Sequence, residues 1–516
     1  MRYGFVIDQD RCIGCHACTV ACKEEHQVPV GVFRTWVKYI EKGEFPNTSR
    51  HFGVMRCNHC DSAPCTTICP TNALFRRSDG IIDFDNQRCI GCKSCMQACP
   101  YDALHIDPQN NTAAKCNFCA HRVEVKLEPA CVIVCPTQAI IAGDLDSPES
   151  KVSRIVATQK VSVRKPHKGT QPKLYYVGIE GDLLEPARLT RQSAMLWADR
   201  AAEPAASAAI SSGHSISNPQ KSKAPNSARE VYDVAHPAPW GWKIALYLWV
   251  KSIAAGVLMV AAILLGLNAG TSGELLNTVG PIIALAALGG TMALLVFDLK
   301  RPDRFYYLLL KPNFRSWLVL GAYILMGYGA LCLDWLYQGL FADGPSPALR
   351  WATAALGAAA ACYSAFLFAQ AKGRDLWQSP LFLWHLLAQA FVAGSATLLG
   401  VSIYMVASPA IIRPTLAILL ASLAVSLLMI LGEVALPHAN EDVRLATRLL
   451  VRGKQSGRFW GMVVFAGSLL PIALCTAMLS SGVREGWSWA AAVLALAGLW
   501  WFEDLWVKAG QAAPLS

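Results

Sequence analysis

Cysteine is concentrated in one part of this chain, where sixteen of its nineteen cysteines fall into four groups of four between residues 12 and 135. The first and third groups have the spacing C-x2-C-x2-C-x3-C, whereas one gap widens to four residues in the second group and to eleven in the fourth. The groups are Cys12, Cys15, Cys18, Cys22; Cys57, Cys60, Cys65, Cys69; Cys89, Cys92, Cys95, Cys99; and Cys116, Cys119, Cys131, Cys135. A proline follows the last cysteine of each of the later three groups. This is the run of bacterial ferredoxins, in which three thiolates bind one iron–sulfur cluster and the fourth binds another.

The short gaps wrap the backbone so that thiolates and amide N–H groups converge on one cluster. Sixteen thiolates at four per cubane predict four 4Fe–4S clusters. A disulfide framework is one alternative, but no signal-peptide pattern precedes the cysteines, and disulfides belong to oxidising compartments. Structural zinc is another, but zinc sites rarely repeat this quartet. Because each quartet already has four thiolates, we interpret His16, His59 and His121 as neighbours of the ligands or spectators.

Short strands are expected to position the cysteine groups. Residues 3–8 and 81–84 are predicted strands that lead into the first and third groups, as in the ferredoxin unit of strand, cysteine run, short helix and strand. The insertion at 24–55 alternates apolar and polar side chains, which favours a packed strand over a partner surface. We therefore predict an α+β, double-ferredoxin-like four-cluster domain over residues 1–185. A flexible linker rich in Ala, Ser, Pro and Asn is predicted at 186–235.

The second half of the chain consists mainly of long apolar runs. Eight of them reach the length of about 20 residues that a helix needs to cross a bilayer. They lie at 241–266, 276–297, 316–338, 348–370, 383–407, 414–436, 459–481 and 486–507. Eight such runs predict an all-α polytopic membrane domain of eight helices over residues 236–516. The net charge of +10 does not indicate nucleic acid, because many Lys and Arg lie in loops between the spans.

The distribution of basic residues predicts the orientation in the membrane. Eight spans place both termini on one side, where the connections and the tail carry thirteen Lys and Arg, against three on the opposite side. The side with more Lys and Arg faces the cytoplasm. We expect a multi-pass protein of the inner (cytoplasmic) membrane, with the iron–sulfur domain and both termini cytoplasmic. An exported partner with a signal for a folded complex would reverse this orientation.

Ionisable residues gather near the predicted cytoplasmic ends of the spans. Charges within spans are costly and are candidates for function. We predict that His236, Asp298, Glu433 and His438 line a quinone pocket. Transmembrane haem b usually needs two facing histidines, and only His385 lies within a predicted span, so we expect no haem.

Other charged residues of the membrane half have simpler expected roles. Lys251 and Glu433 lie deeper, and we expect them to pair or to line a proton path. Lys243, Glu503 and Asp504 are expected at the membrane interface, where a lysine can extend its ammonium group to water.

Both halves resemble known families. The quartets, including Cys12-Ile13-Gly14-Cys15 and Cys89-Ile90-Gly91-Cys92, resemble those of the four-cluster electron-transfer subunit of polysulfide and DMSO reductase-type molybdoenzymes. The membrane half resembles the NrfD/polysulfide reductase-type membrane subunit. That resemblance is carried by His236, Pro237, Trp240, Trp242 and Lys243, by Asp298, Arg301, Pro302 and Phe305, and by Glu433, Pro437 and His438. The family usually makes two subunits, so the fusion through a linker is a departure from its pattern.

The resemblance implies that clusters are shared crosswise between groups. Cys135 is expected to complete the first group and Cys22 the fourth, while Cys99 and Cys69 are exchanged between the second and third. Some relatives replace the cysteine that corresponds to Cys92 and hold a 3Fe cluster. Since Cys92 is present here, four 4Fe–4S clusters are expected.

The resemblance also implies a function. The chain is expected to be the electron-transfer and membrane-anchor component of a respiratory oxidoreductase complex. It would pass electrons between a separate molybdenum or tungsten bis-pterin catalytic subunit and the quinone/quinol pool (menaquinone or ubiquinone), without acting on the primary substrate itself. One alternative is a module of an energy-converting, proton-translocating respiratory or hydrogenase-linked complex. Another is a non-catalytic assembly protein that only binds clusters.

Overall fold

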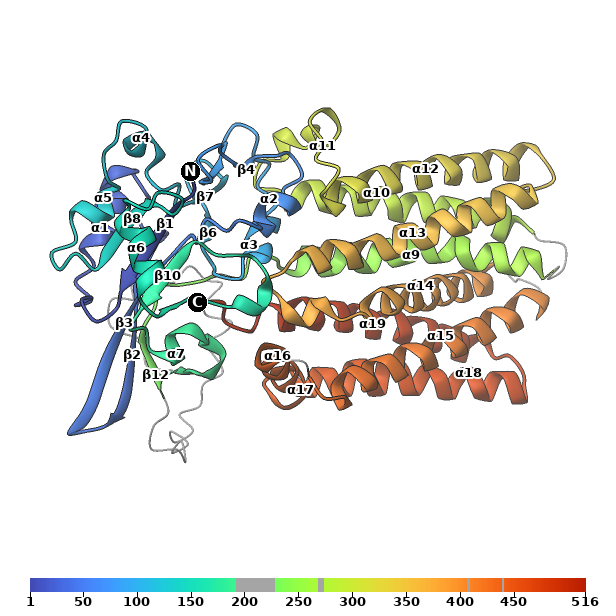
Figure 1. Ribbon diagram of the computed structural model, residues 1–516. Coiled ribbons are helices and arrows are strands. Elements are labelled where there is room, and N and C mark those ends of the chain that lie inside the picture. Colours follow the sequence, from blue (N-terminus) through green and yellow to red (C-terminus); the bar gives the residue numbers. More distant parts are fainter. Residues whose placement is uncertain (192–227, 268–272, 406–408, 439) are drawn as a thin grey trace. The chain divides into compact units, whose positions relative to one another are not determined.

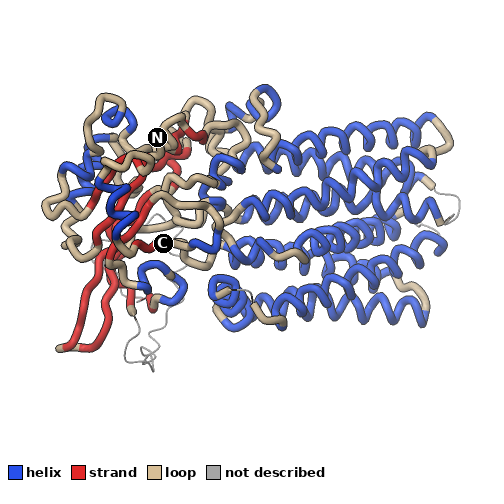
Figure 2. The backbone as a smooth tube through the Cα atoms, in the orientation of Figure 1, coloured by secondary structure: helices blue, strands red, loops and turns tan. Residues whose placement is uncertain are grey.

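The computed structural model describes residues 1–191, 228–267, 273–405, 409–438 and 440–516. Two compact units make up this part of the chain: Met1–Pro237 with Pro514–Ser516, and Ala238–Ala513. The strands belong to the first unit, and the second is helical (Figures 1 and 2). The predicted order of an α+β domain followed by an all-α domain is therefore confirmed.

A four-stranded sheet lies at the centre of the first unit. Its order is β8 (Ile140–Asp144), β1 (Tyr3–Asp8), β10 (Leu174–Val177) and β9 (Val161–Ser162). β1 pairs parallel with β10 and antiparallel with β8. Its apolar residues Phe5, Val6 and Ile7 are buried, as expected of a strand covered on both faces. The strand predicted at 3–8 thus runs through the core and leads into the first cysteine group, which begins at the partly buried Cys12.

A second sheet changes the predicted linker boundaries. It has the order β11 (Thr190–Arg191), β12 (Arg229–Tyr232), β2 (Thr35–Glu44) and β3 (Asn47–Arg56), which confirms the strands expected in the 24–55 insertion. β12 pairs antiparallel with β2, and Arg229 donates to the Glu41 carboxylate at 2.5 Å. The first unit therefore extends to Pro237, and the linker predicted at 186–235 is wrong for the described residues 186–191 and 228–235. Residues 192–227 of the predicted linker lie outside the described residues.

Short hairpins and helices make up the rest of the first unit, and the cysteines lie in some of these helices and in the loops beside them. The hairpins pair β4 (Leu74–Arg76) with β5 (Ile82–Phe84) and β6 (Leu104–Ile106) with β7 (Ala113–Lys115). The short helices are α1 (Ala17–Glu25), α2 (Pro64–Ile68), α3 (Ser94–Ala98), α4 (Ala120–Val123), α5 (Ala130–Ile133), α6 (Lys151–Thr158), η1 (Pro166–Lys168), α7 (Gly181–Leu184) and η2 (Pro186–Arg188). His16, Lys93 and Cys119 have positive φ directly before α1, α3 and α4. These left-handed residues turn the chain sharply between neighbouring cysteines.

Eight helices in the described residues of the second unit are long and apolar enough to cross a membrane. They are α9 (Trp242–Gly266), η4 with α10 (Leu275–Val279, Gly280–Asp298), α12 (Trp317–Phe341), α13 (Pro347–Gln370), α14 (Phe382–Tyr404), α15 (Pro409–Ala435), α17 with η7 and α18 (Ser456–Arg458, Phe459–Leu469, Leu470–Ser481), and α19 (Glu485–Gly510). Short helices η5 (Pro302–Arg304), α11 (Tyr307–Leu310) and η6 (Asp375–Gln378) lie in the connections. Each predicted span is confirmed to within a few residues.

One helix was not expected from the sequence. The connection between the sixth and seventh spans contains α16 (Glu441–Arg452), which begins where the Asn440 side chain accepts a hydrogen bond from the Val443 N–H at 2.9 Å. Its Ala446 and Leu450 are buried, so α16 packs one face against the bundle. The Arg residues counted in this connection therefore lie on a helix rather than in a loop.

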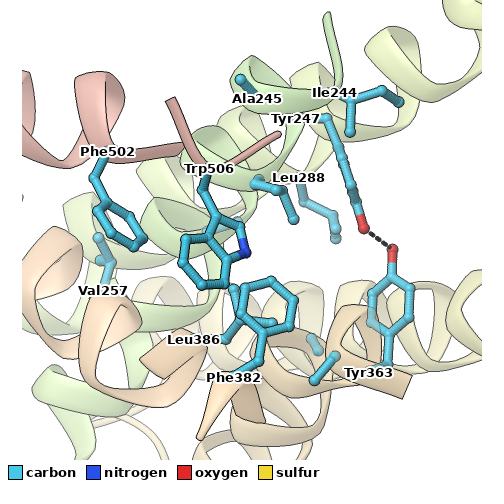
Figure 3. Close-up of a cluster of buried hydrophobic side chains, with 14 of the residues drawn as sticks. Ile244, Ala245, Tyr247, Val257, Leu288, Tyr363, Phe382, Leu386, Phe502 and Trp506 are labelled. Carbon is cyan, nitrogen blue, oxygen red and sulfur yellow. Dashed lines mark hydrogen bonds between the residues drawn. The ribbon is translucent and has the colours of Figure 1, made fainter. Parts of the chain in front are cut away.

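Close backbone contact places α9 and α14 at the centre of the second unit. In each of them, 72% of the most apolar stretch is buried, against 28% for α10 and α12. Gly256 of α9 and Gly394 of α14 face each other so closely that a Cβ on either would overlap the backbone of the other helix. Figure 3 shows aromatic side chains of the surrounding core, including Phe382, Phe502 and Trp506.

Gly256→Val should therefore destabilise the second unit. Overpacking of this contact is expected to lower the free energy of unfolding by about 1–3 kcal/mol. Thermal unfolding of the purified chain in detergent measures the change. Gly289→Val is the matched control, because a Cβ at Gly289 meets nothing within 4 Å. Equal melting temperatures for the two variants would contradict the prediction.

Candidate functional site

Thiols from different cysteine groups meet in the first unit. Cys69 lines one cavity of about 380 Å³ together with Cys89, Cys92 and Cys95. Most of the other lining side chains are apolar and include Pro70, Leu74, Phe84 and Ile90. An apolar chamber with four thiols at its wall suits a cofactor that thiolates bind and that the protein shields from water.

Electrostatic interactions identify the other sets of thiols. Burial raises the pKa of Cys12, and the nearby thiol of Cys135 raises it further. Burial likewise raises the pKa of Cys22, with Cys116 as its strongest thiol neighbour. Cys99 has the same effect on thiols of the second group. The last cysteine of each group therefore lies beside the leading cysteines of another, which is the crosswise arrangement implied by the resemblance.

The sets fit iron–sulfur clusters better than zinc. Among the described residues, no three His, Cys, Asp or Glu side chains converge closely enough to bind a single metal ion. Thiolates on one zinc ion, at about 2.3 Å from the metal, lie only about 3.8 Å from one another. A cubane holds its thiolates further apart, because each binds a different iron.

Backbone N–H groups point at several of these sulfurs. Gly91 and Ala113 donate to Cys89 Sγ at 3.4 and 3.3 Å, and Ala139 donates to Cys135 Sγ at 3.2 Å. Hydrogen bonds to ligand sulfur stabilise the negative charge of a bound cluster and so influence its reduction potential.

Two buried cations lie among the thiols. Arg56 has no exposed surface and donates from Nη1 to Cys131 Sγ at 3.1 Å. Burial lowers the pKa of its guanidinium, but the thiols of Cys131, Cys116 and Cys18 raise it by more. Lys115 is also fully buried and donates from Nζ to the Cys116 carbonyl at 2.7 Å. These cations offset the negative charge that the thiolates bring into the core.

The sequence contained a signal for these cations that the prediction missed. A basic residue directly precedes the first cysteine of every group: Arg11, Arg56, Arg88 and Lys115. Only the tertiary structure distinguishes the exposed residues from the buried ones, because Arg11 and Arg88 extend to solvent and pair with Asp8 and Asp85. Arg56 and Lys115 instead follow strands into the interior.

The histidines near the cysteines have different surroundings. His59 is buried, and its Nδ1 accepts from the Ile82 N–H at 3.2 Å. His121 pairs with Glu25 at 2.7 Å. His26, which the sequence did not single out, lies 3.2 Å from Cys119 Sγ through its Nε2. Burial lowers the pKa of His26 to about 4, so this ring is neutral at pH 7.

His236, one of the four predicted quinone-site residues, lies in the first unit. Its Nδ1 is 2.7 Å from Asp102 Oδ2, and its Nε2 is 3.0 Å from Ser516 Oγ and 3.4 Å from Asp233 Oδ1. Burial lowers the pKa of His236, but the two carboxylates raise it by more, to about 9. His236, as a charged side chain, therefore holds Ser516 within the first unit.

Glu433 lines a cavity in the second unit. The cavity has a volume of about 300 Å³, and Ser379 donates to Glu433 Oε1 at 2.5 Å. Its other lining residues are Leu376, Ile430, Val434, Thr447, Leu450, Phe459, Phe502 and Trp506. Asp298 and His438 are not among them. Of the four predicted residues, Glu433 alone lies at this cavity.

Two charged residues expected at the membrane interface are buried within the second unit. Glu503 was placed at the interface, yet it has no exposed surface. Its helix, α19, packs against α9 and α14 in the bundle interior, and Glu503 is the carboxylate that attracts Lys251 there. Asp504 is also largely buried and accepts from Lys508 at 2.6 Å.

Comparison with known proteins agrees with both units. The family described as "Polysulphide reductase, NrfD" matches residues 230–513, more than half of the chain. A "4Fe-4S dicluster domain" matches residues 49–145 and a "4Fe-4S binding domain" matches residues 3–24. The chain belongs to the polysulphide reductase NrfD family and carries an iron–sulfur domain before the membrane domain.

Curated relatives match the iron–sulfur part. A tetrathionate reductase subunit of Salmonella typhimurium is 44% identical over 200 residues, which are 38% of this chain and 80% of the relative. A polysulfide reductase component of Wolinella succinogenes is 39% identical over 179 residues, covering 34% of this chain and 94% of the relative. The arsenate respiratory reductase iron–sulfur subunit of Shewanella is 34% identical over 227 residues, covering 34% and 96%. The chain therefore joins an iron–sulfur electron-transfer subunit and an NrfD-type membrane anchor in one polypeptide.

Removal of the buried charge of Arg56 should lower the midpoint potentials of the clusters beside it. By Coulomb's law, one unit charge at about 6 Å from a cluster, in an effective dielectric constant of about 20, shifts its midpoint potential by on the order of 100 mV. We expect a downward shift of that order in Arg56→Gln and little shift in Arg56→Lys, as measured by redox titration with electron paramagnetic resonance (EPR).

Arg11→Gln is the control for the Arg56 variant. It removes a basic residue at the same position relative to a cysteine group, but from an exposed side chain. Equal shifts in Arg11→Gln and Arg56→Gln would show that burial of the charge is irrelevant.

Proposed function

We propose that this chain passes electrons through four 4Fe–4S clusters between a molybdenum or tungsten bis-pterin catalytic subunit and membrane quinone. The observation that carries the proposal is the meeting of thiols from different cysteine groups, as Cys69 meets Cys89, Cys92 and Cys95. When one group of cysteines supplies ligands to two clusters, those clusters lie close enough to form an electron relay. An assembly protein that only binds clusters has no need of such a relay.

The catalytic partner is inferred from the relatives. Several of them are named as components of tetrathionate, polysulfide, dimethyl sulfoxide or arsenate reductases. No stretch of this sequence resembles a pterin site, so substrate chemistry falls to a separate subunit. When bound, the clusters supply one-electron steps; the chain supplies thiolates, amide donors and the cations Arg56 and Lys115.

The cavity beside Glu433 is the proposed quinone site. Phe459, Phe502 and Trp506 offer apolar faces for a quinone ring, and Glu433 is the ionisable group at the wall. Oxidation of a quinol releases two electrons and two protons. The Glu433 carboxylate, oriented by the Ser379 hydroxyl, accepts one of these protons.

The other proposed features follow from the sequence. His236, Asp298 and His438 remain predictions as quinone-site residues. The excess of Lys and Arg on one side of the spans supports an inner-membrane protein with a cytoplasmic iron–sulfur domain and cytoplasmic termini. Electron exchange with quinone is proposed to proceed without haem.

Anaerobic purification from membranes, with metal analysis and identification of co-purifying chains, tests the function. We expect about sixteen iron atoms per chain, as four cubanes require, and molybdenum or tungsten in a larger partner subunit. Iron alone, without either metal, would assign the electron donor to another class of enzyme. An iron content near eight would contradict the four-cluster relay.

Glu433→Gln tests the quinone site. Loss of a general base typically costs about 10²–10⁴-fold in rate, so we expect at least a tenfold slower reduction of the clusters by added quinol. Stopped-flow absorbance measures the rate, and dithionite reduction serves to verify intact clusters. Glu485→Gln, at an exposed residue at the start of α19, is the matched control. An unchanged rate in Glu433→Gln would place the quinone elsewhere.

A further inference from the structure

The interior of the second unit contains a set of ionisable and polar side chains that the Glu433 cavity does not include. Four of them come from three helices: Lys251 from α9, His385 and Gln389 from α14, and Glu503 from α19. Each is at most 1% exposed. Charged side chains are rare in this environment because their desolvation costs free energy, so a buried set calls for a physical account.

Lys251 is well supported by neutral partners. Its Nζ donates to the Ala361 carbonyl at 2.6 Å and to Ser364 Oγ at 2.8 Å, and it lies 5.0 Å from the centre of the Tyr363 ring. The hydroxyl of Tyr247 hydrogen-bonds to Ser364 and, at 2.8 Å, to the hydroxyl of Tyr363 (Figure 3). These contacts stabilise an ammonium ion without a direct hydrogen bond to a carboxylate.

Glu503 has the opposite surroundings. Both of its carboxylate oxygens are buried and lack a hydrogen-bond partner among the described residues. Three further polar atoms, two on α14 and one on α19, are also buried and lack a hydrogen-bond partner: His385 Nε2, Gln389 Oε1 and Trp506 Nε1. Buried polar atoms in native proteins almost always have a partner. Ordered water typically binds where buried donors and acceptors lack a protein partner, as these atoms do on two helices that pack together.

We propose that Glu503, facing Lys251 inside the helix bundle, is a hydrated proton-carrying site in the membrane part of this protein. The carboxylate binds one proton to form a neutral acid and later releases it, and no electron is transferred. The ammonium group of Lys251 attracts the ionised form. Water between Glu503 and the open atoms on α14 and α19 supplies the route for the proton. The chain thereby has a proton function separate from its electron relay.

The alternative is a static ion pair that only holds α9 and α19 together. A static pair would be expected to use the carboxylate oxygens in direct hydrogen bonds, as Asp504 does with Lys508. Glu503 and Lys251 interact electrostatically, whereas the hydrogen bonds of Lys251 go to Ala361 and Ser364. Asp504, the adjacent carboxylate on α19, is therefore the matched control for Glu503.

Infrared spectroscopy of the intact protein in lipid tests the site without reference to quinone. Across a pH titration we expect a protonated-carboxyl band that shifts on exchange into D₂O, that is lost in Glu503→Gln and that persists in Asp504→Asn. The other ionisable groups around Glu503 are Lys251, Tyr247 and His385, none of which gives a carboxyl band. Should Glu503→Gln fail to fold, the wild-type spectrum decides, because absence of any exchangeable carboxyl band overturns the proposal.

Proton movement tests the function. In vesicles with an internal pH dye, quinol-driven turnover of the complex should move protons in the wild type and in Asp504→Asn. Glu503→Gln should lower the rate at least tenfold, while Glu503→Asp restores part of it. Cluster reduction, followed by EPR, should stay within twofold in all variants. Wild-type rates in Glu503→Gln, or a parallel loss of cluster reduction, would overturn the proposal.

This vesicle experiment rests on the proposed quinone reaction, and the infrared experiment does not. If quinol fails to reduce the wild-type clusters, the proposed function fails. The exchangeable carboxyl band then still decides whether Glu503 carries a proton.

Discussion

The burial of negative charge among cysteine ligands is the constraint on which the first unit depends. The sixteen thiols predicted as ligands cannot be held together by apolar packing alone, because as thiolates they would repel one another. Arg56 and Lys115 bring positive charge into the same core, and Gly91, Ala113 and Ala139 turn their N–H groups toward sulfur. Both cations end strands, so the sheets and hairpins position the charge as well as the ligands. The fold is thereby an electrostatic scaffold as much as a hydrophobic one.

The second unit meets a related constraint with different means. Within a bilayer, polar groups must find partners inside the protein. Lys251 meets this requirement through the Ala361 carbonyl and the hydroxyl of Ser364, and Glu433 through Ser379. Glu503 stands apart, because the described side chains leave its oxygens open. Close contact of Gly256 and Gly394 brings α9 and α14 together, and so helps to decide which polar side chains share the interior.

The electron and proton roles assigned to the chain rest on groups of residues that differ except for Trp506. The relay depends on thiols and buried cations of the first unit. The Glu433 cavity lies among η6, α15, α16, η7 and α19, whereas Lys251, His385 and Glu503 lie on α9, α14 and α19. α19 contributes to both membrane sites through Trp506 and Glu503, which are three residues apart on one helix. A helix shared in this way offers a physical route by which quinone chemistry and proton movement can influence each other.

Residue spacing alone predicted the cluster ligands and determined the spans. Short gaps favour convergence of the thiols within a group, and an apolar run of about 20 residues has few stable alternatives to a membrane helix. The meeting of Cys69 with Cys89, Cys92 and Cys95 is a tertiary contact between groups. Spacing could not show that 228–232 returns to pair with β2, that Arg56 is buried while Arg11 is exposed, or that Lys251 faces Glu503 rather than Glu433. Those outcomes depend on contacts between residues far apart in the chain. Only the tertiary structure decides them, because burial and charge pairing are properties of the packed fold.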